Sequence, residues 1–432
     1  MKLSLLPACL MALLTPLSAM TTFTTPVELT PGGELFQLSQ TPTRTAAFSS
    51  DGSLHVVYWA GASESTLLTP STVYYQSRTP QGAWGALVEL DANATIDQGS
   101  GPQKIGGRHP NLGLGANGDL WVVWHDYRHV NPNPPGNGVD NIEVYAQLRP
   151  FGGGAPQEFR LTNTAAPHFG DNSYLPRLAI LPNGSFSVLW YDFNANADVS
   201  DLYALHTANL ATYSPEPIGS LRLTVETSRP GNTLERPYSA ADFLADSTNT
   251  LHAVWTSQFD TEAPVWYSTV PNPSTTVSEE QLFATSGGFI DPPRLVLAPN
   301  DDLWVVVKSG SPATIQARRK PAALQAFEAP LTLVAAGSNK QPSLAVDSAG
   351  ALHLSWISGG NTVNYRKLTQ SGTPVENATL ATGENYQRTN LLLGPSDEPI
   401  VFFDALSSGS EGAVFVVQQE LPAATVGWAE YE

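Results

Sequence analysis

A short hydrophobic phrase recurs seven times along this chain of 432 residues. Each copy is rich in apolar residues and usually ends in an aromatic one, and most copies follow a tight-turn signal such as Asp51-Gly52 or Asn117-Gly118. The copies are residues 54–59, 120–124, 186–190, 251–255, 303–307, 352–356 and 399–403. Strand, tight turn and strand, repeated without helical periodicity, are typical of a β-propeller. The sequence therefore predicts an all-β fold, a seven-bladed β-propeller.

Each unit also contains a candidate outer strand, and these strands indicate how the ring closes. They are residues 87–90, 159–162, 221–224, 281–283, 331–333 and 378–380. Residues 26–30, Pro-Val-Glu-Leu-Thr, have the same character but precede the first unit. We expect this N-terminal strand to close the last blade, which removes the exposed sheet edges that invite aggregation. Residues 21–432 are predicted to form a single propeller domain, with residues 421–432 as a tail.

Residues 1–20 have the features of a signal peptide. Lys2 precedes an apolar run over residues 3–14, and the small pair Ser18-Ala19 follows as a cleavage site. Cys9, the only cysteine, lies inside this segment. The mature protein is therefore expected to lack disulfides and thiol chemistry, and to be secreted or periplasmic.

The formal net charge of -18 limits the kinds of partner. Such an acidic surface repels nucleic acids and anionic membranes. After residue 20, no apolar run is long enough to span a bilayer. We expect no nucleic-acid partner, no membrane insertion and a monomeric protein. An anionic substrate would need a local cationic patch that overrides the overall field.

The repeat units in the first half of the chain are longer than those in the second half. The phrases that end at residues 59, 124, 190 and 255 are spaced by 65, 66 and 65 residues, whereas the later spacings are 52, 49 and 47. The tight turns stay short, and the additional residues fall in 91–108, 125–141, 164–174 and 191–201. All four segments map to the propeller face opposite the tight turns. Because loops carry sites while the scaffold holds them, we expect a cleft on that face.

The expected innermost strands, about ten residues before each phrase, carry two rows of residues. The polar row is Thr45, Asn111, Arg177, Asp242, Arg294, Ser343 and Asn390. The row one residue later is apolar and comprises Ala46, Leu112, Leu178, Phe243, Leu295, Leu344 and Leu391. Alternation along a strand sends the two rows to opposite sides, so the polar row should line the central channel.

Residues with acid-base or cationic chemistry gather at the mouth of the predicted cleft on the second to fourth units. Before the innermost strands these are Arg108, His109, Tyr174, Arg236 and Tyr238, and after the phrases they are His125, Arg128 and Tyr191. His125 and Tyr191 occupy equivalent places on adjacent blades, and so approximately do His109 and Tyr174. A His/Tyr pair beside arginines suits β-elimination from a uronic acid. Arginine neutralises the carboxylate, a neutral His or Tyr removes the C5 proton, and Tyr protonates the leaving oxygen.

One segment spaces oxygen ligands at alternate positions, as calcium loops do. Its candidate ligands are Asp192, Asn194, Asn196 and Asp198. The segment lacks the glycine and the terminal glutamate of an EF-hand, so a solvated hairpin loop is the alternative. We expect no required cofactor, with Ca²⁺ as the metal that this segment could bind.

The stretch Trp124-His-Asp126-Tyr-Arg128, followed by residues 141–145, resembles a Trp-x-Asp-x-Arg…Asp-Ile-Tyr pattern of exported bacterial propellers with sialidase-like repeats. The signal peptide, the seven units and the His/Tyr/Arg cluster on the second to fourth units resemble the secreted, seven-bladed ulvan lyases. That resemblance implies a His/Tyr elimination mechanism in a canyon on one face. It implies His109 or His125 as base or second proton carrier, and Tyr174 or Tyr191 as acid/base. Candidates for substrate contacts are Arg108, Arg128, Arg177, Arg236 and Tyr238.

Two alternatives to a uronate polysaccharide lyase stay open. The first is a non-catalytic propeller that binds a glycan or a protein at the cell surface. The second is a sialidase-like glycoside hydrolase in which Arg177, Arg294 and Arg388 surround a carboxylate. Sialidases have six blades, however, and the segment Ser50-Asp51-Gly52 lacks their Ser-x-Asp-x-Gly-x-Thr-Trp box.

Overall fold

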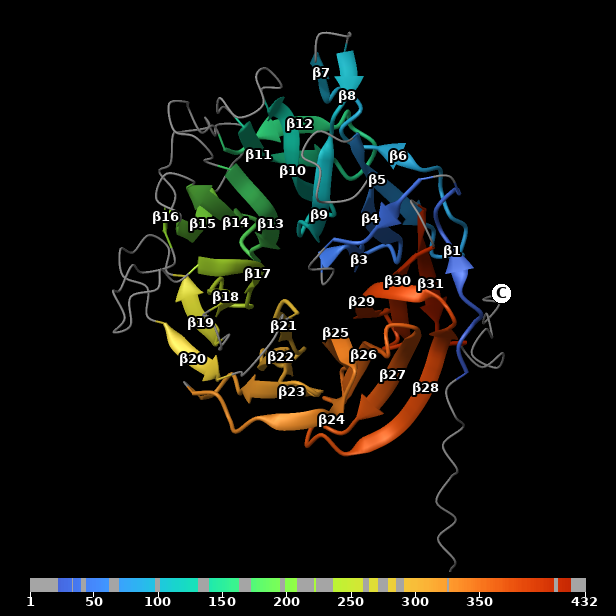
Figure 1. Ribbon diagram of the computed structural model, residues 1–432, viewed down its shortest axis with the longest axis vertical. Helices are drawn as coiled ribbons and strands as arrows, with labels where there is room; N and C mark the ends of the chain where they lie inside the picture. The colour runs from blue at the N-terminus through green and yellow to red at the C-terminus, as the bar shows by residue number, and fades with distance from the viewer. Residues whose placement is uncertain are drawn as a thin grey trace, which may run out of the picture.

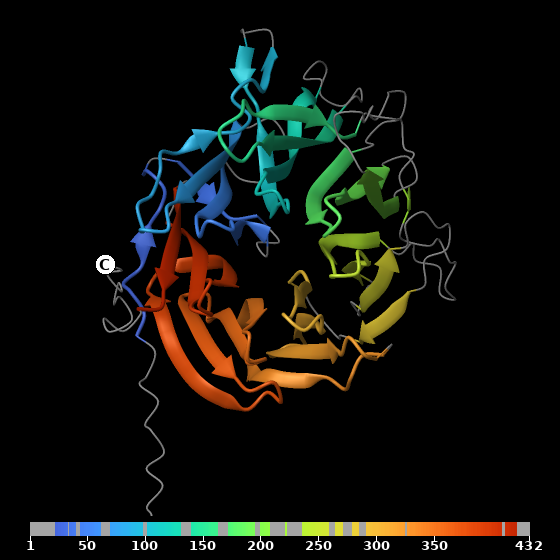
Figure 2. The same ribbon diagram turned by 180° about the vertical axis from the view of Figure 1, so that it is seen from behind.

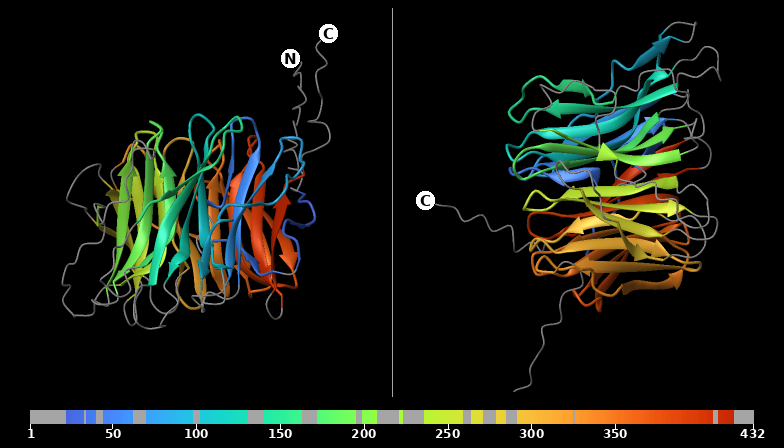
Figure 3. Two further views of the ribbon diagram at one scale, coloured as in Figure 1. Left: turned by 90° about the horizontal axis from the view of Figure 1, so that it is seen from above. Right: turned by 90° about the vertical axis from the view of Figure 1, so that its left-hand side faces the viewer.

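The computed structural model describes residues 22–32, 34–39, 44–61, 70–97, 102–130, 140–162, 172–194, 199–207, 221–222, 236–258, 264–270, 279–284, 291–324, 326–407 and 411–420. Over these ranges seven antiparallel sheets surround a central axis, and Figures 1 and 2 show the ring from its two sides. Figure 3 shows the ring edge-on, with most strands running between the two faces. The predicted seven-bladed β-propeller is confirmed.

The first four blades occupy the chain up to residue 284. Blade 1 contains β2 (Phe36–Gln37), β3 (Ala46–Phe48), β4 (Leu54–Gly61), β5 (Ser71–Arg78) and β6 (Val88–Glu89). Blade 2 contains β9 (Gly107–Leu114), β10 (Leu120–Val130), β11 (Asp140–Arg149) and β12 (Gln157–Arg160). Blade 3 contains β13 (Asn172–Ile180), β14 (Phe186–Asn194), β15 (Val199–Thr207) and β16 (Leu221–Arg222). Blade 4 contains β17 (Arg236–Ala245), β18 (Leu251–Gln258), β19 (Val265–Val270) and β20 (Glu280–Phe283).

The last three blades complete the ring. Blade 5 contains β21 (Arg294–Leu297), β22 (Leu303–Ser309), β23 (Ala313–Lys320) and β24 (Leu331–Gly337). Blade 6 contains β25 (Asn339–Val346), β26 (Leu352–Ser358), β27 (Thr362–Leu368) and β28 (Pro374–Thr382). Blade 7 contains β29 (Asn385–Leu393), β30 (Pro399–Leu406), β31 (Gly412–Gln418) and β1 (Val27–Glu28). Within the described ranges, no helix has the length and hydropathy needed to cross a bilayer.

A residue with left-handed φ makes each tight turn, two positions before the phrase strand begins. These residues are Gly52, Gly118, Gly184, Asn249, Asp301, Gly350 and Asp397, with φ between 62° and 85°. Glycine adopts this conformation without steric cost, and asparagine and aspartate tolerate it better than other side chains. The turn chemistry therefore repeats even where the glycine does not.

The apolar row fills the spaces around the blades. Each of its seven members belongs to a different hydrophobic cluster, as is seen for Leu112, Leu178 and Phe243. Since successive residues of a strand point to opposite sides, the polar row must face the axis. All seven members of that row are buried. The predicted separation of the two rows is confirmed.

The N-terminal strand closes the ring, as predicted. β1 pairs with β31 through Val27–Val416 and Glu28–Phe415, which gives the sheet order β1-β31-β30-β29. The buried Asp404 carboxylate strengthens the junction between blades 7 and 1, because it accepts the Leu38 N–H at 3.0 Å and pairs with Arg388 at 3.0 Å. The predicted tail, residues 421–432, lies outside the described residues.

Two segments that the sequence suggested as loops are partly strand. Residues 91–108 contain a hairpin of β7 (Thr95–Asp97) and β8 (Pro102–Lys104), which projects beyond the ring in Figure 1. Residues 125–141 continue β10 and begin β11, with Asp126 opposite Glu143. The ladder extends because backbone N–H and C=O groups gain more from cross-strand pairing than from irregular structure at the rim.

Candidate active site on blades 1 to 3

Four aromatic and imidazole rings predicted to belong to a site lie in one chain across blades 2 and 3. The ring centroids of His109 and His125 are 5.2 Å apart, and those of His125 and Tyr174 are 5.6 Å apart. Tyr191 follows at 6.3 Å from Tyr174. Trp59 of blade 1 extends the chain at 5.1 Å from His109. Tyr174 thus lies between His125 and Tyr191. We call His109, His125, Tyr174 and Tyr191 the ring chain.

Backbone bulges position this group. His109 and Leu175 have φ of 53° and 51°, and each precedes a proline. The strand register shifts at both places, between β9 and β10 and between β13 and β14. A left-handed residue other than glycine costs about 1–3 kcal/mol and is often found where a strand redirects a side chain beside a site. Gln341 of blade 6 repeats this geometry with φ of 51°.

The bulge at Leu175 fixes the hydrogen position on His125. The Leu175 N–H donates to Nδ1 of His125 at 3.1 Å. A backbone N–H can only donate, so Nδ1 accepts, and a neutral His125 must carry its hydrogen on Nε2. Nε2 is buried without a hydrogen-bond partner among the described residues. His125 therefore has an N–H donor that makes no hydrogen bond with the described residues.

Burial keeps both histidines of the ring chain neutral. His109 and His125 are 3% and 2% exposed. Desolvation lowers the pKa of each far below its ordinary value. Repulsion from the charges of Arg388, Arg108 and Arg177 lowers the pKa of His109 further, and Arg108 and Arg177 do the same for His125. Tyr174 and Tyr191 are only partly buried, so they are the members of the ring chain nearest to solvent.

Two of the predicted arginines lie near the ring chain, and their charges act on both of its histidines. The Arg108 guanidinium is buried, with its carbon 4.6 Å from the Tyr127 ring centroid and 5.5 Å from that of Trp59. Arg177 is also buried and donates to the carbonyls of Leu175 and Pro176 at 2.9 and 2.8 Å. Both cations therefore contribute a local positive field inside an acidic protein.

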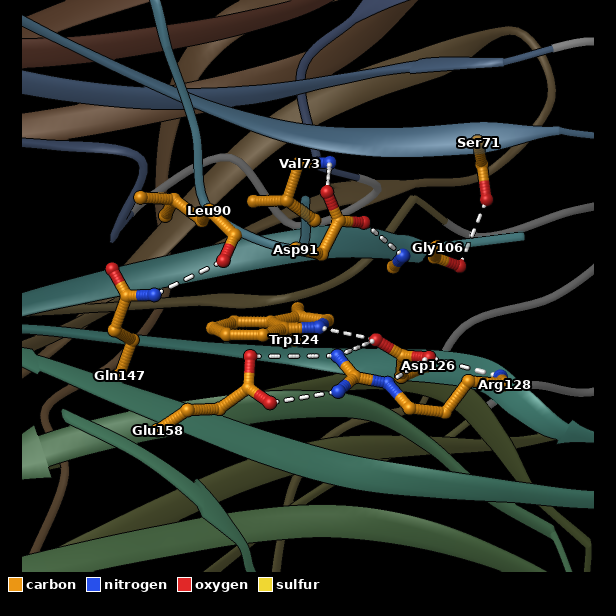
Figure 4. Close-up of polar contacts among 11 residues, drawn as sticks. Ser71, Val73, Leu90, Asp91, Gly106, Trp124, Asp126, Arg128, Gln147 and Glu158 are labelled. Carbon is orange, nitrogen blue, oxygen red and sulfur yellow. Dashed lines mark hydrogen bonds and ion pairs between the residues drawn. The ribbon is translucent and has the colours of Figure 1, made fainter. Parts of the chain in front are cut away.

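Arg128, the third predicted arginine, is held in ion pairs within its own blade and has a structural role. Its guanidinium pairs with Asp126 and Glu158, both at 2.7 Å, and lies 4.1 Å from the Tyr145 ring centroid. Asp126 also accepts the Trp124 indole N–H at 2.9 Å. Figure 4 shows this network next to Asp91 and Gly106. The Trp-x-Asp-x-Arg stretch thus ties the end of β10 to the blade.

Two glycines allow the strand before Arg108 to lie close to its neighbours, and sequence reasoning did not select them. A Cβ on Gly106 would lie 1.9 Å from an Asp91 carboxylate oxygen, and one on Gly107 would lie 2.0 Å from the Trp124 ring. Asp91 accepts the Gly107 N–H at 2.6 Å, and burial raises the pKa of Asp91 to about 7. The adjacent pair Gly106-Gly107 immediately before Arg108-His109 was the available signal.

Several candidate residues lie outside the part of the chain whose side chains are described. They are Arg236, Tyr238, Asp192, Asn194, Asn196 and Asp198. The strands on either side of the calcium candidate are paired, with Asp192 opposite Asp201 and Asn194 opposite Val199, and residues 195–198 lie outside the described residues. Among the described residues, no group of three His, Cys, Asp or Glu side chains is arranged to hold a metal ion.

No known protein family and no curated protein matches this sequence. The polysaccharide lyase Uly1 superposes with a TM-score of 0.57 at 9% identity, over 93% of this chain and 100% of that one. A protein of unknown function from Dyadobacter fermentans gives 0.50 at 9% identity, over 91% and 99% of the two chains. A Trypanosoma rangeli sialidase gives 0.48 at 10% identity, over 77% and 58%. At these identities the likeness to the first two structures establishes a shared propeller fold.

Proposed function

We propose that this protein is an exported polysaccharide lyase that cleaves a uronate-containing, ulvan-like and sulfated polysaccharide by β-elimination. The observation that carries the proposal is the ring chain, in which His125 retains an unused N–H donor beside the buried Arg108 and Arg177. The fold shared with the polysaccharide lyase Uly1 supports it. The enzyme acts as a monomer on an anionic polysaccharide and needs no cofactor.

The roles follow from hydrogen positions and exposure. Because Nε2 of His125 carries a hydrogen, His125 donates to the uronate carboxylate, and the fields of Arg108 and Arg177 help to neutralise it. The neutral His109 then takes the C5 proton as base. The C4–O bond breaks as the C4=C5 double bond forms. Tyr174, which solvent reaches, gives its hydroxyl proton to the leaving oxygen.

The substrate itself helps the base to work. In the absence of substrate, burial and neighbouring cations hold the pKa of His109 far below its ordinary value. A carboxylate arriving beside the arginines offsets that repulsion and raises the proton affinity of His109. Proton abstraction is therefore favoured only when a uronate is bound.

The test is to incubate purified mature protein with a panel of uronate polysaccharides, ulvan included, in water enriched in ¹⁸O. A lyase produces unsaturated uronates and incorporates no solvent oxygen at the cleaved bond, whereas a hydrolase incorporates one atom per cleavage. A product with solvent oxygen would replace the lyase with a glycoside hydrolase.

The deep burial of His109 and His125 favours a second candidate, a non-catalytic propeller that binds a glycan or a protein through the more exposed Tyr174 and Tyr191. Such a protein would retain the polysaccharide in an affinity gel without shortening it.

Addition of a chelator separately tests Ca²⁺ at residues 192–198, and full activity after chelation would exclude a required metal.

A further inference from the structure

The seven axis-facing residues of the polar row form a layer across the central channel, and we call it the channel layer. Some members bond to one another, as Asn390 does when it donates to the Thr45 hydroxyl at 2.9 Å. Two members are arginines, Arg177 of blade 3 and Arg294 of blade 5, with exposures of 1% and 0%. A buried guanidinium normally needs a carboxylate or a full set of acceptors.

Neither arginine obtains that set. Arg177 uses Nε and Nη1 on the carbonyls of Ala241, Leu175 and Pro176, but its Nη2 has no hydrogen-bond partner among the described residues. Arg294 donates from Nη2 to Gln341 at 3.1 Å, while its Nε and Nη1 likewise have no such partner. The two buried cations therefore have three nitrogens whose N–H groups lack an acceptor among the described residues.

Other arginines of the ring show the contrast. Arg388 meets Asp404 at 3.0 Å, and Arg319 of blade 5 meets Asp302 at 2.5 Å. Asp242 lies on the blade between Arg177 and Arg294, but its carboxylate accepts the N–H groups of Phe243 and Leu295, each at 2.8 Å.

Charge in the layer is correspondingly unbalanced. Arg44 also donates to Asp242, at 3.4 Å, so three guanidinium groups share the field of this carboxylate. Burial is the largest cause that lowers the pKa of Arg177 to about 9 and that of Arg294 to about 10. Nearby arginines contribute to the lowering, while Asp242, and at Arg294 also Asp291, act in the opposite direction. The layer therefore holds excess positive charge in a place from which water is largely excluded.

We propose that the channel layer binds a small inorganic anion, a halide such as chloride, between Arg177 and Arg294. The ion would accept hydrogen bonds from these three nitrogens, and its negative charge would offset the repulsion between the two cations. Arg177 belongs to this site and its charge also acts on the proposed lyase site, whereas Arg294 belongs to this site alone.

The surroundings favour a compact ion over an extended one. A cavity of about 330 Å³ adjoins the layer on the tight-turn side, because all of its lining residues except Arg44 follow the polar row along the inner strands. Arg44 is the one charged lining residue, and the others are aliphatic, including Leu244, Val296 and Leu392. Apart from Arg44, the side chains of this lining offer no hydrogen-bond donor to the oxygens of a polyatomic anion. A halide needs only the guanidinium groups.

The first experiment is thermal unfolding at fixed ionic strength while sodium gluconate is replaced by sodium chloride. We expect a saturable rise in Tm of about 2–4 °C, because an ion that binds only the folded state stabilises it. Arg294→Gln should remove this rise. The matched control, Arg319→Gln on the same blade, removes a carboxylate-paired arginine and should retain it.

Crystals of the unaltered protein soaked in bromide provide a second test that does not depend on how the variants fold. The proposal requires an anomalous peak between Arg177 and Arg294. Absence of the peak would overturn it. A peak without halide-specific stabilisation would mean an adventitious ion only, and would overturn it as well. Neither result depends on lyase activity, so this proposal and the proposed function fail separately.

Discussion

The molecule contains two kinds of His/Tyr group, and they differ in whether their hydrogen bonds are complete. At the tight-turn side of blades 4 and 6, each ring nitrogen of the histidine has a partner. His252 contacts the Tyr267 hydroxyl at 2.7 Å and Asp246 at 3.2 Å. His353 contacts the Tyr365 hydroxyl at 2.9 Å and Asp347 at 3.1 Å. On blade 1, His55 repeats the device with Tyr75 and Ser49.

In the ring chain, by contrast, His125 has one bonded nitrogen and one that is buried without a partner among the described residues. Its neighbours are arginines rather than carboxylates, and its position depends on a left-handed bulge at Leu175. The complete groups therefore stabilise the blades, whereas the incomplete group has a donor to offer a ligand. The two kinds of group contain the same residue types and differ in the hydrogen-bond partners of the histidine.

The largest effect should come from removing the ring nitrogens in each kind of group. His125→Phe keeps the ring but loses the Nε2–H donor, so we expect kcat/KM on a uronate polysaccharide to fall about 10²–10⁴-fold. His252→Phe loses the bonds to Tyr267 and Asp246 and should lower Tm with activity per folded molecule unchanged. Equal activity losses in the two variants would remove the distinction.

The second effect concerns the strand that carries Arg108 and His109. Gly107→Ala places a Cβ 2.0 Å from the buried Trp124 ring, so we expect a loss of about 2–4 kcal/mol in the free energy of unfolding, with activity reduced. Gly184→Ala is the control, because a Cβ there meets no atom within 4 Å and only the φ of 81° is strained. It should cost about 1 kcal/mol. Denaturant unfolding of both variants measures the difference.

The third effect tests the carboxylate of a complete group. Asp347 holds His353, the Lys367 ammonium at 2.9 Å and the Ala351 N–H at 2.7 Å. Asp347→Asn removes the charge from these bonds and should lower the free energy of unfolding by about 1–3 kcal/mol. Urea denaturation checks this, and an unchanged midpoint would show that the group does not stabilise blade 6.

The smallest effect is on the pH dependence of stability. Burial lowers the pKa of His55, His252 and His353 below 6.5. As pH falls below about 6.5, the unfolded chain binds protons that the folded one does not, so these groups lose their contribution to stability. His353→Phe should therefore reduce the slope of unfolding free energy against pH between about 5 and 6.5. Asp91, with its raised pKa, acts in the opposite sense but equally in both proteins.

Much of the fold could be predicted because it depends on local periodicity. Alternation placed Leu178 between blades and Arg177 on the axis, and turn residues such as Gly184 marked where each phrase strand begins. The sequence also predicted that His109, His125, Tyr174 and Tyr191 gather, with His125 beside Tyr191 and His109 beside Tyr174. The rings do gather, but His125 contacts Tyr174, a member of the other predicted pair.

The hydrogen-bond state of the site could not be predicted. It depends on two pre-proline residues, His109 and Leu175, adopting left-handed φ, and no pattern distinguishes these X-Pro steps from ordinary extended ones. For the same reason, the sequence did not separate Arg128, which is paired with Asp126 and Glu158, from Arg177. Partners across a sheet are set by register and bulges rather than by spacing.

The most direct test of the central claim is the appearance of unsaturated uronate from ulvan, followed as absorbance at about 235 nm, with wild-type protein, Tyr174→Phe and Tyr267→Phe measured side by side. If the ring chain is the active site, the signal rises for wild type and for Tyr267→Phe. The rate for Tyr174→Phe is then lower by about 10²-fold or more. A flat trace from folded wild-type protein would contradict the lyase assignment. Equal rates in all three would contradict the site.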